Sequence, residues 1–368
     1  MKFGLSDEEK MLQFSVRKLF SQLQSGIGNP RDFIDSPKLT KEIRQVLGEQ
    51  GLLGVIEKSD KGVKGLLAAC AINQEFGKTL LPYPLLENII GAYLLLEDAN
   101  QGEIYNSVVN GESTLSIAWH SNGEPYAYQE GDMYRGNGSF YAVPFANDVD
   151  KILAAFYLKG AGDIPSQEIQ IVIIDKNDPT VSIKEMDSMD QTYPLYRVEV
   201  CNYAFSHSQI INTSKSGREQ LFFIEQMAAL LSSSELLGIS EEVLKQTVEY
   251  TKVRKQFEQP IGRFQSIKHI AAENYVLIES SRVAIYYAAW ALEVGVEPES
   301  VSIAKAYTSD AATEITASGI QVHGGIGFTW ECDMHLFFKR ARRLASHFGD
   351  AYTHRERLIE PIRNLANQ

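Results

Sequence analysis

The sequence has few of the residues that mark secreted, membrane-spanning or nucleic-acid-binding proteins. Its three cysteines, Cys70, Cys201 and Cys332, are too far apart to form a CxxC metal site or a disulfide framework. No apolar run reaches the roughly 20 residues of a membrane span, and the start MKFGLSDEEK lacks the apolar segment of a secretory signal. Basic residues are also scarce, because 35 Lys and Arg against 47 Asp and Glu give a net charge of -12. We therefore expect a cytoplasmic protein that binds neither membrane nor nucleic acid.

Two changes of periodicity divide the 368 residues into three parts. Residues 1–112 carry apolar side chains at helical spacing, and Ser6 followed by Glu9 has the spacing of a capping box. Residues 113–212 consist of short β-rich runs between turn residues, and residues 213–368 return to helical spacing. We predict a multi-domain α+β protein with an N-terminal helical domain (1–112), a central antiparallel β domain (113–212) and a C-terminal four-helix bundle (213–368).

The later two domains can be divided further into elements. Clusters of Gly, Pro, Asn and Asp bound the β-rich runs and the long helical segments. The predicted strands include 114–119, 152–157, 169–174 and 196–205, and the predicted helices are 217–257, 266–293, 298–322 and 333–364. Several of these helices are apolar on more than one stripe, so we expect the bundle to pack against another subunit.

A basic segment joins the first two bundle helices. It places Lys252, Arg254, Lys255 and Arg263 close together in an otherwise acidic chain. These cations either complement the negative end of a helix dipole or clamp a phosphate, for which Arg254 offers a planar fork of donors. The segment alone favours the dipole interpretation.

A glycine-rich turn, Gln321-Val-His-Gly-Gly-Ile-Gly327, joins the third and fourth bundle helices. Its glycines either cap a helix or let backbone N–H groups approach an anionic or polar ligand. The spacing matches neither a Walker loop nor a dinucleotide fingerprint. The histidines of this region, His323, His335, His347 and His354, lie too far apart for a compact ligand set, so we expect no metal site.

Together these motifs resemble the acyl-CoA dehydrogenase family of flavoproteins over nearly the whole chain. The motifs are Arg254-Lys-Gln-Phe257, Pro260-Ile261, Phe264-Gln265, Lys268-His269 and Gln321-Val-His-Gly-Gly-Ile-Gly-Phe-Thr-Trp-Glu331. The resemblance implies a helix–sheet–helix fold, FAD as cofactor, α,β-desaturation of an acyl-CoA thioester, and an electron-transferring flavoprotein as acceptor. The stretch from His323 to Glu331 is similar to a bacterial branch that degrades sterols, dicarboxylates and other bulky acids, often as paired unlike subunits.

In this family the two motif segments reach across a dimer to the ADP half of a neighbour's FAD. By position, Arg254 would contact the pyrophosphate and Phe257 would pack on the ADP half. The cofactor-binding residues that the resemblance implies are Arg254, Gln256, Phe257, Ile261, Phe264, Gln265, Gln321, Gly324 and Gly325.

The catalytic base of the family is missing from its two usual positions. Aligned by motif, these positions hold Phe348 and Ala228, and neither side chain can accept the α-proton. The nearest carboxylates are Asp350, two residues after Phe348, and Glu225, one helical turn before Ala228.

The residues that would contact the flavin ring also differ from the family pattern. The Thr/Ser-rich loop of the family corresponds to Ala118–Pro125, and its hydroxyl-bearing strand corresponds to Phe140-Tyr-Ala142. We therefore interpret the chain as the partner subunit of a heteromeric FAD enzyme. One alternative is a self-contained homomeric dehydrogenase with Asp350 or Glu225 as base. A second alternative is a structural subunit that binds no flavin.

Overall fold

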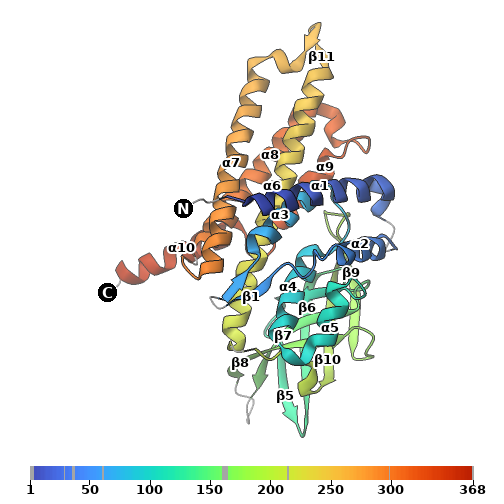
Figure 1. Cartoon of the computed structure of the whole chain (residues 1–368), viewed down its shortest axis with the longest axis vertical. Helices are drawn as coiled ribbons and strands as arrows, with labels where there is room; N and C mark the ends of the chain where they lie inside the picture. Colours follow the sequence, from blue (N-terminus) through green and yellow to red (C-terminus); the bar gives the residue numbers. More distant parts are fainter. Residues whose placement is uncertain are drawn as a thin grey trace. The chain divides into compact units, whose positions relative to one another are not determined.

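The structure is a computed structural model that describes residues 4–28, 30–34, 38–59, 62–159, 165–213, 215–297 and 299–366 (Figure 1). The chain forms two compact units. The bundle unit comprises residues 1–32, 59–81 and 228–368, and the sheet unit comprises residues 33–58 and 82–227. This division by compactness does not test the predicted domain boundaries at residues 112 and 212, which stay a prediction.

The elements follow one another in the order helices, strands, helices. They are α1 (Asp7–Ile27), η1 (Pro30–Phe33), α2 (Lys38–Glu49), β1 (Glu57–Ser59), β2 (Gly62–Lys64), α3 (Leu66–Gly77), α4 (Leu85–Glu97), η2 (Ala99–Gln101), α5 (Gly102–Val109), β3 (Leu115–Ala118), β4 (His120–Ser121), β5 (Tyr126–Glu130), β6 (Met133–Pro144), β7 (Lys151–Lys159), β8 (Pro165–Asp175), β9 (Val181–Met186), β10 (Leu195–Phe205), η3 (His207–Gln209), α6 (Gly217–Val253), β11 (Lys255–Gln256), β12 (Gln259–Pro260), η4 (Ile261–Arg263), α7 (Gln265–Val294), α8 (Glu299–His323), η5 (Gly324–Phe328), α9 (Met334–Ser346) and α10 (Ala351–Ala366). The predicted fold class is confirmed.

In the bundle unit, α8 packs against α7, α9 and α10, and α1 packs against α3. The capping box at the start of α1 is confirmed, because the Glu9 N–H donates to Ser6 Oγ and the Ser6 N–H donates to the Glu9 carboxylate. The most apolar stretch of α6 has the length and composition of a membrane span, but 83% of it is buried within the protein. Such burial is typical of the core helix of a soluble protein.

Two glycines allow α3 and α6 to cross closely. A Cβ atom on Gly238 would lie 1.8 Å from the carbonyl oxygen of Gln74, and one on Gly77 would lie 2.2 Å from the carbonyl oxygen of Glu235. Both distances are far shorter than any non-bonded contact, so only glycine fits at either position. Ion pairs from Lys78 to Glu75 (2.9 Å) and Glu241 (2.7 Å) lie next to this crossing.

The predicted fourth helix, 333–364, is wrong as a single helix, because the structure divides it into α9 and α10. His347 is extended after the last turn of α9, and Phe348 and Gly349 follow with φ of 60° and 94°. Positive φ values cannot continue a right-handed helix. Asp350 then starts α10 by accepting a hydrogen bond from the Thr353 N–H (2.7 Å).

A lysine is fully buried among α6, α8 and α9. Lys305 Nζ donates to Ser232 Oγ (3.2 Å) and to the carbonyl oxygen of Leu344. Burial, reinforced by the charge of Arg343, lowers the pKa of Lys305 to about 7, although Glu235 and Asp350 act in the opposite direction.

We expect Lys305→Met to flatten the pH dependence of stability above neutral pH. The folded pKa lies below the ordinary 10.5, so the unfolded chain binds more protons between these values and the free energy of unfolding rises with pH. The wild-type slope from this group is about 1 kcal/mol per pH unit, measurable by urea unfolding at several pH values. The exposed Lys252→Met is the control. An equal slope in wild type and Lys305→Met would refute the lowered pKa.

The sheet unit is built on an eight-stranded sheet with the order β3-β7-β5-β6-β10-β9, in which β4 pairs with β6 and β8 with β7. The four predicted strands correspond to β3, β7, β8 and β10. The expected antiparallel domain needs one correction, because β7 pairs in parallel with both β3 and β5. One core cluster includes Phe140, Phe156 and Phe205, and Phe140 and Phe156 meet edge to face at 5.7 Å. Helix α4 packs against β3 in the same unit.

Candidate functional site

A tight hairpin joins α6 to α7 at one end of the bundle unit (Figure 1). Gln256 pairs with Gln259 across a two-residue turn, Phe257 and Glu258, whose φ values are 51° and 64°. Such turns favour Asn and Gly, and each larger residue in this conformation costs on the order of 1–3 kcal/mol. The turn nevertheless holds the Phe257 side chain 85% exposed. A strained turn that presents an aromatic ring to solvent points to a binding role for that ring.

The fold explains some of the glycines in the turn after α8 but not all of them. Gly324 has a φ of 65°, and a Cβ on Gly327 would lie 2.8 Å from the carbonyl oxygen of Ile320. Both glycines are therefore required by the fold. A Cβ on Gly325 would meet no atom within 4 Å, and its φ is not positive. Nothing within the described chain requires glycine there, which fits close approach of an external group.

The hairpin and the glycine-rich turn line one open hollow of about 500 Å³. The predicted cofactor residues that line it are Arg254, Gln256, Phe257, Ile261, Phe264, Gly324 and Gly325. Gln265 and Gln321 are exposed but are not among the lining residues. Five further residues that we did not predict complete the lining: Tyr250, Ser266, Ile267, Val322 and His323.

Two of these unpredicted residues, Tyr250 and His323, connect the hairpin segment to the glycine-rich turn. The rings of Tyr250 and His323 stack at 4.3 Å, and the Tyr250 hydroxyl donates to the carbonyl oxygen of His323 (3.4 Å). His323 Nδ1 lies 2.8 Å from the carbonyl oxygen of Gly319. In the sequence, only the position of Tyr250 and His323 beside or within the two motifs indicated this linking role. The stack fixes the hairpin relative to the turn, so the hollow is preformed.

Arg254 supplies an available positive charge at this hollow. Its side chain is exposed and forms no ion pair with any residue in the described ranges. Lys252, two residues earlier, is paired with Glu249 at 2.6 Å. The guanidinium can therefore donate to an anionic ligand without first breaking an ion pair.

The two positions that lack the expected base are both buried in the bundle unit. Ala228 is fully buried and Phe348 is 3% exposed. Asp350 is exposed, and its hydrogen bond from the Thr353 N–H lowers the pKa of its carboxyl group. These contacts give Asp350 a structural role as the N-cap of α10 and make it a weak proton acceptor.

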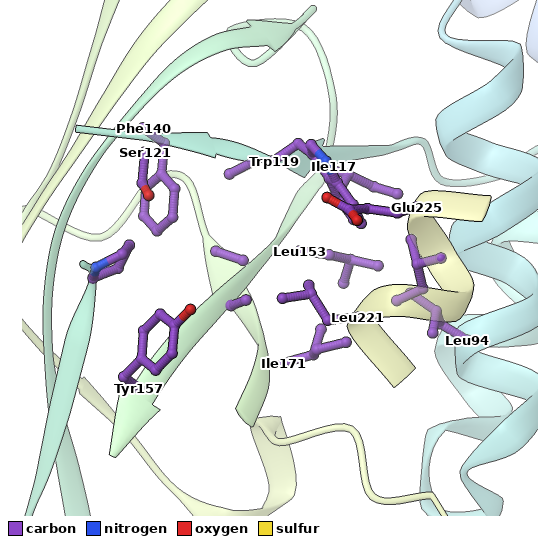
Figure 2. A pocket seen from close by; sticks show the side chains of 15 residues that line it. Leu94, Ile117, Trp119, Ser121, Phe140, Leu153, Tyr157, Ile171, Leu221 and Glu225 are labelled. Atoms are coloured by element: carbon purple, nitrogen blue, oxygen red, sulfur yellow. The ribbon is translucent and has the colours of Figure 1, made fainter. Parts of the chain in front are cut away.

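The altered strand and loop lie in the sheet unit. Ala142 has a φ of 53°, and its N–H points at Met186 Sδ (3.4 Å). Trp119, Ser121 and Phe140 line a separate pocket, together with Tyr157 and Glu225 (Figure 2). Glu225, the second candidate base, thus lines a pocket of its own unit.

Sequence comparison assigns the C-terminal part of the chain. Residues 226–362 match the family described as acyl-CoA dehydrogenase, C-terminal domain. The acyl-CoA dehydrogenase IpdE2 of Mycobacterium tuberculosis is 45% identical over 118 residues, which cover 32% of this chain and 36% of IpdE2. The acyl-CoA dehydrogenase FadE34 of the same organism is 32% identical over 305 residues, which cover 81% of this chain and 39% of FadE34. The chain thus spans little more than a third of the length of either relative.

Comparison of structures extends the similarity to the whole chain. The ChsE4-ChsE5 complex from Mycobacterium tuberculosis contains a chain that superposes with a TM-score of 0.86 at 21% identity, with all of both chains covered. At this level of identity the likeness concerns the fold. It includes the sheet as well as the bundle.

Proposed function

The chain belongs to the acyl-CoA dehydrogenase family, and we propose that it is the partner subunit of a heteromeric, FAD-dependent acyl-CoA dehydrogenase. In this proposal the hollow between the hairpin and the glycine-rich turn receives the ADP half of an FAD whose flavin ring lies mainly in a neighbouring chain. The observation that carries the proposal is the convergence of Arg254, Phe257 and Gly325 on one hollow.

The residues of the hollow suit the ADP half of FAD. Arg254 would donate to the pyrophosphate, and the exposed ring of Phe257 offers a face for stacking. The missing Cβ of Gly325 leaves room for the ligand next to the backbone. When bound, FAD accepts the hydride that leaves the β-carbon of an acyl-CoA thioester. This chain's own contribution would be to hold and orient the nucleotide end.

Two features support the partner role: the chain lacks the expected catalytic base, and it exposes apolar side chains next to the hollow. Phe348 and Ala228 cannot remove the α-proton, so a neighbouring chain would supply the base. Beside the hollow, Ile326, Phe328 and Trp330 are 45%, 74% and 54% exposed. A solvent-exposed apolar group of this kind favours coverage by another protein chain. The ChsE4-ChsE5 complex, formed by two differently named chains, offers a structural parallel.

A self-contained enzyme is the second candidate. It is favoured by Glu225, a carboxylate that lines a pocket in the sheet unit. A structural subunit without flavin would leave the glycine at position 325 and the strained turn at Phe257 without a reason.

The proposal predicts that carboxylate variants of this chain retain activity in the assembled enzyme. The chain is purified alone and together with a co-expressed homologous subunit, and flavin absorption and acyl-CoA turnover are measured. We expect flavin mainly in the co-purified complex, and turnover of Asp350→Asn and Glu225→Gln within about twofold of wild type, since loss of a true base costs about 10²–10⁴. If either variant abolishes turnover while FAD is retained, the self-contained enzyme replaces this proposal. A complex without flavin would support the structural subunit.

A further inference from the structure

An open groove of about 410 Å³ lies in the bundle unit, where α6 and α7 converge on the hairpin (Figure 1). Its lining includes Val248 from the end of α6, Pro260 from β12, and Ile267 and Ala271 from the start of α7. These residues are partly buried and give the groove an apolar floor. Among the described residues, only Ile267 also lines the hollow that we assign to the nucleotide, so the groove is a separate site.

The rim of this groove is basic. Lys252, Arg263 and Lys268 line it, and no carboxylate among the described residues does. Lys252 is already paired with Glu249 at 2.6 Å. Arg263 and Lys268 are exposed and form no ion pair within the part of the chain that the structure describes. Two unpaired cations beside one apolar groove are unexpected in a chain of net charge -12.

The helix dipole does not explain these two unpaired cations. It accounts for Lys252, which lies in the last turn of α6 at the negative end of that helix. Lys268 lies at the start of α7, and Arg263 comes just before it in η4. This is the positive end of α7, where acidic side chains are favoured and cations are not. The placement of Arg263 and Lys268 therefore fits the binding of a negatively charged group better than stabilisation of the helix.

We propose that this groove binds an acidic amphipathic helix of another polypeptide, with its apolar side chains on the floor and its carboxylates next to Arg263 and Lys268. An apolar groove on a protein surface is a recurring receptor for the apolar face of a helix. The basic rim favours an acidic partner, because charges around an interface determine which partners are accepted. The inference goes beyond the proposed function and requires neither FAD nor the subunit that would complete the enzyme.

The volume of the groove agrees with a helical occupant. A cavity of about 150 Å³ holds one benzene ring, so 410 Å³ has room for two or three aliphatic side chains. One face of a short helix presents about this number over two turns.

The probe is a fluorescein-labelled peptide made of four repeats of Glu-Glu-Leu-Leu, whose anisotropy is titrated with the full chain. One control peptide repeats Lys-Lys-Leu-Leu, which keeps the apolar face and reverses the charge. The other repeats Glu-Glu-Ser-Ser, which keeps the charge and loses the apolar face. We expect saturable binding of the first peptide and at least about tenfold weaker binding of both controls. Non-specific attraction to a chain of net charge -12 would favour the lysine peptide instead.

Charge reversals locate the bound peptide. Arg263→Glu and Lys268→Glu should each weaken binding at least about threefold, and the double variant at least about tenfold. Lys18→Glu makes the same change of charge on α1, outside the groove, and should change affinity less than about twofold. All three side chains are exposed, so we expect the variants to fold as wild type does, which circular dichroism checks.

Several results would overturn the proposal. It fails if the acidic apolar peptide does not bind, if the lysine peptide binds as tightly, or if the folded double variant binds as wild type does. An equal loss of affinity in Lys18→Glu would also refute it. If dodecanoate below its micellar concentration binds in place of the peptide, or if sedimentation shows self-association that the double variant abolishes, the occupant is a lipid or a second copy instead. Flavin content plays no part in these measurements, so their failure would leave the proposed function standing.

Discussion

Replacing Arg254 with alanine should weaken FAD binding to the assembled enzyme about 10- to 150-fold. A hydrogen bond from a guanidinium to a pyrophosphate contributes roughly 1.5–3 kcal/mol, which corresponds to this range of dissociation constants. The loss of FAD affinity should approach the full contribution of this hydrogen bond, because Arg254 has no competing ion pair among the described residues. Flavin retained after dialysis and a fluorescence titration of the apoprotein measure the loss.

Two further substitutions separate a specific contact from general electrostatics. Arg254→Lys keeps the charge but loses the planar fork, so its affinity should lie between those of wild type and Arg254→Ala. Lys252→Ala removes an equal charge two residues away, where the lysine is already paired with Glu249, and should change affinity less than about twofold. Equal losses in Lys252→Ala and Arg254→Ala would contradict a contact with the pyrophosphate.

Gly238→Ala should lower the free energy of unfolding by about 3 kcal/mol, at the upper end of overpacking effects. The added methyl group would lie 1.8 Å from the carbonyl oxygen of Gln74, which belongs to backbone and cannot rotate away. Helices α3 and α6 would have to separate to admit it. Urea unfolding followed by circular dichroism measures the change.

Gly26→Ala is the matched control in the same unit. Gly26 lies within α1, and a Cβ there would meet nothing within 4 Å. Alanine is the better helix former, so this variant should gain up to about 1 kcal/mol. A Gly238→Ala protein as stable as wild type would show that α3 and α6 do not cross as closely as the structure indicates.

Most of the helices could be predicted from the sequence because their apolar side chains recur at helical spacing. The predicted start of the second bundle helix at residue 266 lies one residue from the start of α7, Gln265. The break between α9 and α10 was missed because it depends on Phe348, whose positive φ no local preference indicates. Gly349 and Asp350 were the available signals, as a helix-ending glycine followed by an N-cap.

The sheet and the pocket show where sequence patterns stop being informative. Alternation predicts that β7 is a strand, but its parallel pairing with β3 and β5 is set by long-range packing. The pocket around Glu225 draws on segments between residues 94 and 225 of the chain, so no local motif marks it. The hollow at Arg254 was predictable in part because the residues that form it are concentrated in two short motifs.

The buried ring of Phe348 has a consequence for how this chain can evolve. Phe348 is 3% exposed, and its carbonyl oxygen accepts a hydrogen bond from His354 Nε2 (3.0 Å), a histidine whose pKa burial lowers to about 4. A glutamate in place of the ring would leave a void and place a carboxylate beside a histidine that is neutral at pH 7, and each change is destabilising. A single Phe348→Glu substitution should therefore lower the free energy of unfolding of this chain. Placing a base at this site would therefore require the surrounding core to change first.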